Sequence, residues 1–341
     1  MVNKTFTKTV GGRTWHYSHS IGHHVGPNGF ANPCPVVHGP DNLLYVGNTG
    51  LTENHKGPNP ILNPRITKLT IEQEPLAQFG YGDLVWPQGL AVDTSGNIYC
   101  SDAHGHFVIV YDSEGNMLDR WGQKGSGQGE FKAPSGLSFD KDGSLWVVDS
   151  GNHRVQKFTV DGKYISEWGS HGSAPGKLDQ PWGITIDKRG DVYVVDWGNN
   201  RVQKFTQDGT YIMTFGSDID DGGQLSRPSD VAVDSEGDVY VVDWGNNRVQ
   251  VYYSDGDIIT GLYGDAHVFS ESAQEVMDTN ADYQQAFRRV TPHDLVQLGL
   301  FERPRGIAID EADRIVVTDC IRGRLQVYVK DKEHVPPQFN L

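Results

Sequence analysis

Six prolines recur along the chain, and each is followed by a different side chain. The six following residues are Cys34, Gln88, Ser135, Trp182, Ser229 and Arg305. We predict a substrate pocket at these positions, with Arg305 binding an anion or a carbonyl oxygen and Trp182 forming a stacking wall. The polar groups that would orient the substrate are those of Gln88, Ser135 and Ser229. The alternative is a water-filled channel that binds no ligand.

A second candidate site is an aspartate that lacks its usual partner. Four aspartates stand five residues before an arginine, which indicates recurring structural ion pairs: Asp149, Asp196, Asp243 and Asp319. Asp102 instead has Phe107 at that position, and His104 and His106 lie between them. Carboxylates and imidazoles bind metals and transfer protons near neutral pH. We predict Asp102 and His104 as catalytic, and one divalent metal ion (Zn or Ca) held by His104 and His106. A locally repacked corner with an exposed carboxylate is the alternative.

Cys34 is a candidate nucleophile. A reactive thiolate needs a lowered pKa, which the positive charge of Arg305 or Arg322 could supply. The alternative is a small side chain that only packs.

These residues belong to repeated units. The segment VVDWGNNRVQKF at 194–205 returns as VVDWGNNRVQVY at 241–252, with related copies at 147–158 and 316–328. The units begin at prolines, three of whose successive spacings are 47 residues: Pro33, Pro87, Pro134, Pro181, Pro228 and Pro304. Turns rich in Asp and Gly divide each unit into four short strands. Repeats of this kind predict an all-β, six-bladed β-propeller with four-stranded antiparallel blades, forming a single domain over 1–341.

The two ends of the chain are expected to close the ring. The sixth unit lacks a fourth strand, and residues 14–22 resemble the fourth strand of the other units. We therefore predict that this N-terminal strand completes blade six, which removes an exposed sheet edge.

One long insertion, 264–303, separates units five and six. Ser272 and Glu275 form a capping-box pattern, which predicts helix in this insertion. We predict that it lies over the channel mouth as a lid and that His293 completes the site. A docking or dimer surface is the alternative, so a protein partner or a homo-oligomer through the insertion is also considered.

The units resemble NHL repeats over nearly the whole chain. The family motif, an aspartate followed by Asn-x-Arg, is present at 149–154 and 196–201. The resemblance implies a six-bladed propeller, a fold that serves both enzymes and binding scaffolds. The lyase half of the peptide-amidating system, similar in fold, has zinc-binding histidines directly after this proline. None of the six residues here is histidine, so neither that zinc site nor that reaction is carried over.

The composition of the chain limits the kinds of molecule that it is expected to bind. There are 44 acidic and 29 basic side chains, for a net charge of −15, which disfavours nucleic acid. No apolar run is long enough to span a membrane, and no secretory leader is evident at the N-terminus. Three cysteines suit a reducing compartment, so we expect a cytoplasmic protein. Nothing in the sequence indicates a nucleotide cofactor.

The sequence therefore predicts an enzyme that acts on a small polar or anionic substrate at the channel mouth. A lyase or a hydrolase is favoured, with or without metal assistance. The alternative is a non-catalytic NHL scaffold that binds a protein partner through its loop-rich face.

Overall fold

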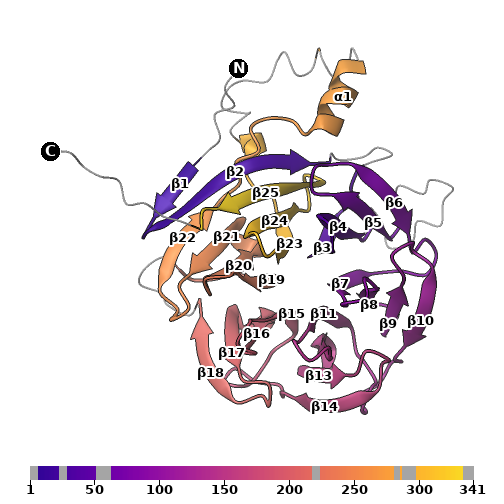
Figure 1. Ribbon diagram of the computed structural model, residues 1–341. Helices are drawn as coiled ribbons and strands as arrows, with labels where there is room; N and C mark the ends of the chain where they lie inside the picture. Colours follow the sequence, from indigo (N-terminus) through magenta and orange to yellow (C-terminus); the bar gives the residue numbers. More distant parts are fainter. Residues whose placement is uncertain are drawn as a thin grey trace.

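Six antiparallel sheets form the blades of a ring (Figure 1). The computed structural model describes residues 7–22, 29–50, 63–216, 223–279, 285 and 297–332. The predicted all-β, six-bladed propeller is confirmed. None of the helices in these residues has the length and apolar character needed to cross a bilayer.

The first strand of each blade lies innermost and the last strand outermost. Blade one consists of β3 (Pro33–His38), β4 (Leu43–Asn48), β5 (Arg65–Thr70) and β6 (Pro75–Phe79). Blade two consists of β7 (Pro87–Val92), β8 (Ile98–Asp102), β9 (Phe107–Tyr111) and β10 (Met117–Trp121). Blade three consists of β11 (Pro134–Phe139), β12 (Leu145–Asp149), β13 (Arg154–Phe158) and β14 (Tyr164–Trp168). Blade four consists of β15 (Pro181–Ile186), β16 (Val192–Asp196), β17 (Arg201–Phe205) and β18 (Tyr211–Phe215). Blade five consists of β19 (Asp230–Val233), β20 (Val239–Asp243), β21 (Arg248–Tyr252) and β22 (Ile258–Leu262).

Blade six joins the two ends of the chain, as predicted. It contains β23 (Pro304–Ile309), β24 (Arg314–Asp319) and β25 (Arg324–Lys330), followed by the N-terminal strand β2 (Arg13–Ile21). The sequence analysis missed a fifth strand, β1 (Thr7–Val10), which pairs with the outer edge of β2. The two-residue turn between them is Gly11-Gly12, both with positive φ, a conformation that glycine adopts without a steric penalty.

The hydrophobic core lies between neighbouring blades and not at the ring centre. Apolar residues of strands two and three form clusters that join adjacent sheets, one cluster at each of the six blade junctions. The junction between blades five and six includes Trp15 of β2, whose indole N–H donates to the Tyr240 hydroxyl at 2.9 Å. The N-terminal strand is therefore part of the core.

The predicted aspartate–arginine pairs are present at the turn between strands two and three, here called the blade corner. In blades three to six each aspartate is fully buried, and its Oδ2 lies 2.8 or 2.9 Å from the arginine Nε. The first strand begins beside this corner, because Pro181 pairs with Asp196 and the same register recurs in other blades. The corners and the residues that follow the prolines thus share one face of the ring.

The described part of the insertion includes the helix α1 (Glu271–Thr279), at the outer edge of the ring near blades one and six (Figure 1), and a short helical stretch at 297–299. Its N-cap is Ser270 and not the predicted Ser272, because the Ser270 hydroxyl accepts the Ala273 N–H at 3.2 Å. The same hydroxyl donates to the Gly22 carbonyl at 2.6 Å. Most of the rest of the insertion lies outside the described residues, so a lid over the channel mouth stays a prediction.

Candidate functional site

The residues that follow the prolines converge at the start of the central channel, as expected from their repeated position. Five of the six line one cavity of about 40 Å³: Cys34, Gln88, Trp182, Ser229 and Arg305. This volume holds a few water molecules or one small polar group of a ligand. Deeper in the channel the first strands of all six blades enclose a wider space of about 300 Å³. A larger ligand would therefore place only its reacting group in the narrow part.

Gln88 is the centre of the polar network in this cavity. Its side-chain oxygen accepts hydrogen bonds from Trp182 Nε1 at 3.0 Å and Arg305 Nη2 at 3.3 Å. Two such donors fix the orientation of the amide, since the opposite orientation would place donor against donor. The Gln88 Nε2 atom is buried and has no hydrogen-bond partner within the described part of the chain. An acceptor atom of a ligand or a water would satisfy it.

Arg305 differs from the arginines of the blade corners. Its guanidinium lies 5.1 Å from the ring centre of Trp182, a cation–π arrangement. It forms no ion pair with any residue that the structure describes, whereas the corner arginines of blades three to six each contact a carboxylate. An arginine without a carboxylate partner, in a chain of net charge −15, is available to bind an anion.

Asp230 is a candidate residue that the sequence analysis missed. It lines both the narrow cavity and the wider part of the channel. Its carboxylate accepts backbone N–H groups of Val231 at 2.9 Å and Ile307 at 3.0 Å. Although part of its surface faces the channel, burial raises its pKa from 3.8 to about 7 because few groups there stabilise the charge. Both protonation states are then accessible near neutral pH.

The signal for Asp230 was present in the repeat. Four units read Pro-x-Gly at the start of strand one, but unit five reads Pro228-Ser229-Asp230. The glycine is needed because the next blade lies close: a Cβ on Gly183 would be 2.6 Å from Asp230 Oδ1. The carboxylate therefore occupies a position where most blades have no side chain.

Cys34 lies in the cavity wall, with its thiol 3.8 Å from the side-chain oxygen of Gln88. Burial raises the pKa of this thiol to about 12, and the opposing effect of the Arg305 charge is smaller. The geometry therefore disfavours the predicted nucleophile, because the thiolate would be scarce at neutral pH.

Ser135 and Ser229 tie neighbouring blades together. The Ser135 hydroxyl donates to the Trp182 carbonyl at 2.9 Å, and the Ser229 hydroxyl donates to the Arg305 carbonyl at 2.8 Å. Ser229 also lines the cavity, whereas Ser135 is not part of its wall. Their protons are engaged with the backbone, so their first role is to hold the positions of Trp182 and Arg305.

Asp102 occupies a corner without an arginine and is fully buried, so the exposed carboxylate considered as the alternative is not found. One of its oxygens accepts the N–H groups of Val85 and Trp86, and the other accepts those of His104 and Gly105. Four backbone donors replace the missing guanidinium and occupy the carboxylate. The geometry thus favours a structural role for Asp102 over the predicted catalytic role.

The two histidines beside Asp102 have different surroundings. His104 is exposed, and His106 Nδ1 accepts the Ala133 N–H at 3.1 Å. Neither belongs to a group of three close ligand atoms in the described ranges. The predicted role of His293 cannot be placed in the site, because this residue lies outside the described residues.

Comparison with protein families identifies the repeated units. The NHL repeat model matches residues 131–158, 178–205, 225–252 and 301–328, and a model described as a beta-propeller repeat matches 76–101. The chain is an NHL-repeat six-bladed β-propeller. No curated protein matches it in sequence.

Several solved structures share the fold of this NHL propeller. A catalytically inactive virginiamycin B lyase from Staphylococcus aureus, solved with quinupristin, is 17% identical with a TM-score of 0.56, and the match covers 96% of this chain and 97% of that one. A gluconolactonase from Xanthomonas campestris is 14% identical with a TM-score of 0.59, covering 94% and 91%. A nidogen/laminin complex matches at 18% identity and a TM-score of 0.52, covering 75% and 92%. At these identities the similarity shows the fold alone.

Proposed function

We propose that this NHL propeller is an enzyme that acts on a small polar or anionic substrate at the mouth of its central channel. The observation that carries the proposal is a convergence of three groups on one cavity: the guanidinium of Arg305, the Nε2 donor of Gln88 and the carboxyl of Asp230. Purely structural packing would not require that a carboxyl group line the same cavity as an arginine with no ion pair in the described chain.

Each group has a distinct task in this proposal. Arg305 and Gln88 Nε2 would bind a carboxylate or the oxygen that gains charge in the transition state. The Trp182 ring would hold the substrate against the guanidinium. Asp230 would accept a proton, either from a carbon next to a carbonyl group or from an attacking water. The first reaction is that of a lyase and the second is that of a hydrolase.

Two features support these reaction classes. A carboxyl with a pKa of about 7 is suited to proton transfer at neutral pH. The fold is also that of proteins described as a lyase and as a gluconolactonase. A metal could assist, as the sequence analysis allowed, but the steps above need only the residues of the cavity. Binding of a protein partner by a non-catalytic scaffold remains the alternative.

The test is turnover of a panel of lactones, carboxylic esters and acids with a leaving group β to the carbonyl. We expect Arg305→Ala to lower kcat by roughly 10²- to 10³-fold, the usual effect of removing one transition-state donor. We expect Asp230→Asn to lower it by roughly 10²- to 10⁴-fold. Arg227→Ala is the matched control, because Arg227 lies 5.3 Å from the Trp197 ring in the same kind of contact but outside the cavity wall. Unchanged turnover in both cavity variants would refute the proposal.

A further inference from the structure

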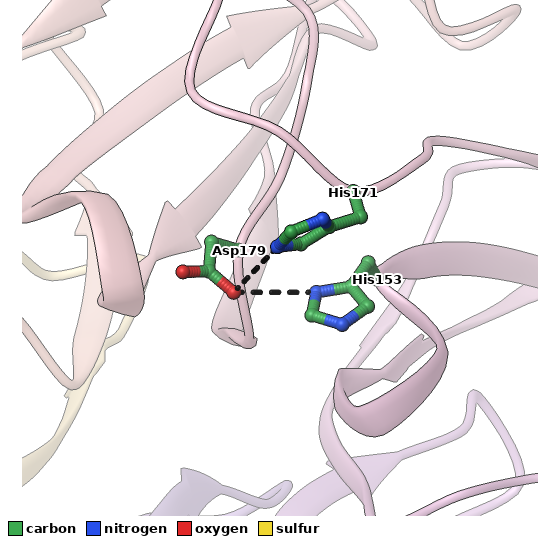
Figure 2. Close-up of side chains that lie close together, drawn as sticks. All are labelled: His153, His171 and Asp179. Atoms are coloured by element: carbon green, nitrogen blue, oxygen red, sulfur yellow. Dashed lines mark ion pairs between the residues drawn. The ribbon is translucent and has the colours of Figure 1, made fainter.

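Three side chains with metal-binding atoms meet at the corner between blades three and four (Figure 2). His153 follows the short 3₁₀ helix η2 (Ser150–Asn152) and has a left-handed backbone, with φ of 55°. His171 belongs to the connection between β14 and β15, and Asp179 lies two residues before β15. The group lies outside the channel cavity and has no part in the proposed reaction.

The spacing of the ligand atoms suits a small metal ion. Asp179 Oδ1 lies 3.5 Å from His153 Nδ1 and 3.5 Å from His171 Nε2 (Figure 2). Two ligands that each lie about 2.0–2.1 Å from a tetrahedral ion are separated by roughly 3.3–3.4 Å. All three ligand atoms lie within 4.8 Å of one another. The two imidazole nitrogens would have to approach one another to the same separation to complete the geometry.

The nitrogen of His153 in this group is already free of its proton. His153 Nδ1 accepts the backbone N–H of Gln180 at 3.0 Å, so the neutral ring carries its hydrogen on Nε2. An ion bound at Nδ1 would take over the lone pair that now accepts the Gln180 N–H.

The preceding corner, between blades two and three, shows that the fold does not need His171 or Asp179. There His106 Nδ1 accepts the Ala133 N–H, as His153 accepts that of Gln180. Lys124 and Lys132 occupy the positions of His171 and Asp179: Lys124 bridges to Phe131 as His171 does to Leu178, and Lys132 N–H donates to the next corner aspartate as Asp179 N–H does. The ligand set is thus particular to one corner.

We propose that His153, His171 and Asp179 form a binding site for one divalent transition metal ion of the zinc class. Two imidazoles and one carboxylate suit zinc and its neighbours, whereas calcium and magnesium prefer sites made of oxygen atoms alone. The His171 side chain is 68% exposed, so solvent can reach the ion and fill its remaining positions. Protons compete for the imidazoles, and binding should weaken as the pH falls below about 6.

The experiment is titration of untagged, chelator-treated protein with Zn²⁺ by calorimetry and with Co²⁺ by visible absorption. We expect one ion per chain. His153→Asn should weaken binding by at least roughly the 10- to 100-fold that loss of an outer-shell partner costs. This variant preserves the corner, since Asn200 and Asn247 accept the equivalent N–H groups at 2.8 Å in blades four and five. His171→Lys and Asp179→Lys, which copy the preceding corner, should abolish the cobalt spectrum.

The matched control is His106→Asn, which makes the same change at the corner without the ligand set. It should leave both the stoichiometry and the affinity unchanged. The proposal is wrong if the unaltered protein binds neither ion, or if binding survives His153→Asn and Asp179→Lys as well as it survives His106→Asn. The thermal melting curve of each variant without metal shows whether the corner has kept its fold.

Discussion

The blade corners and the residues that follow the prolines lie on the same face of the ring. The corner residues are repeated from blade to blade, whereas the residues after the prolines vary. In blades three to six the corner repeats one network, with a fully buried aspartate bonded to an arginine five residues later. The position after the proline has the same place in each blade, but its side chain differs in almost every one. The network that is repeated in each corner is the one that each blade needs in order to fold. A position whose backbone is repeated but whose side chain varies is a candidate for a single binding or catalytic site.

This contrast also explains Asp102 and Asp230, two acids with different environments. Asp102 belongs to a corner, and four backbone N–H groups compensate for its missing arginine. Asp230 replaces a glycine of the repeat, and two backbone N–H groups do not compensate for its burial. The first acid keeps the repeated structure intact, and the second departs from it.

The largest effect on stability should come from a corner. Asp196 accepts bonds from the Asp179 N–H, from Asn199, from Arg201 Nε and from Gln203. Asp196→Ala leaves these donors without their acceptor, and we expect the free energy of unfolding to fall by about 3–5 kcal/mol. Urea denaturation measures it.

The matched substitution in the channel is Arg305→Ala. Because this arginine has no ion pair in the described chain, we expect a loss of less than about 1 kcal/mol. Equal losses of unfolding free energy in Asp196→Ala and Arg305→Ala would contradict the view that corner residues stabilise the fold more than channel residues do.

A smaller effect should follow from filling the glycine space beside the channel. In Gly183→Ala the new Cβ would lie 2.6 Å from Asp230 Oδ1 and 2.9 Å from the Ser229 carbonyl. Blades four and five would have to separate slightly, and we expect a cost of about 1–3 kcal/mol. Thr185→Ala, in the same strand β15, removes atoms without adding any and should change stability by less than about 1 kcal/mol. A Gly183→Ala protein as stable as the parent would mean that the strands are not held in close contact here.

Most of the fold could be predicted because each blade is encoded locally. The repeated sequence segments determine strand length and turn type. The Asp–Arg spacing of five residues spans one tight corner, so this contact is local in the sequence. The strand β2 was also recognisable, since its sequence resembles a fourth strand. The strand β1 was not predicted, although Gly11-Gly12 is typical of a hairpin turn, because β1 lies outside the four strands that complete blade six.

The site was harder to predict because it depends on contacts between blades. The proline rule placed five side chains in one cavity, but the bonds that converge on Gln88 come from Trp182 and Arg305, far away in sequence. The four donors of Asp102 depend on how two loops fold back toward it. The approach of Asp179 to His153 likewise requires two neighbouring blades to be in place. Residue types alone could not distinguish these outcomes.

The smallest expected effect is the pH dependence that Asp230 gives to stability. Its pKa is about 7 in the folded protein and 3.8 when exposed, so the folded state holds the proton more tightly. Unfolding then releases a proton between these values, and stability falls as the pH rises from about 4 to about 7 and is level above. Asp230→Asn cannot titrate, so its stability relative to the parent should rise over this range, by on the order of 1 kcal/mol because channel water offsets part of the burial. Melting temperatures of both proteins from pH 4 to pH 8 measure the difference. A difference that does not change with pH would mean that burial does not raise the pKa of Asp230, and this carboxyl would then have no special suitability for proton transfer at neutral pH.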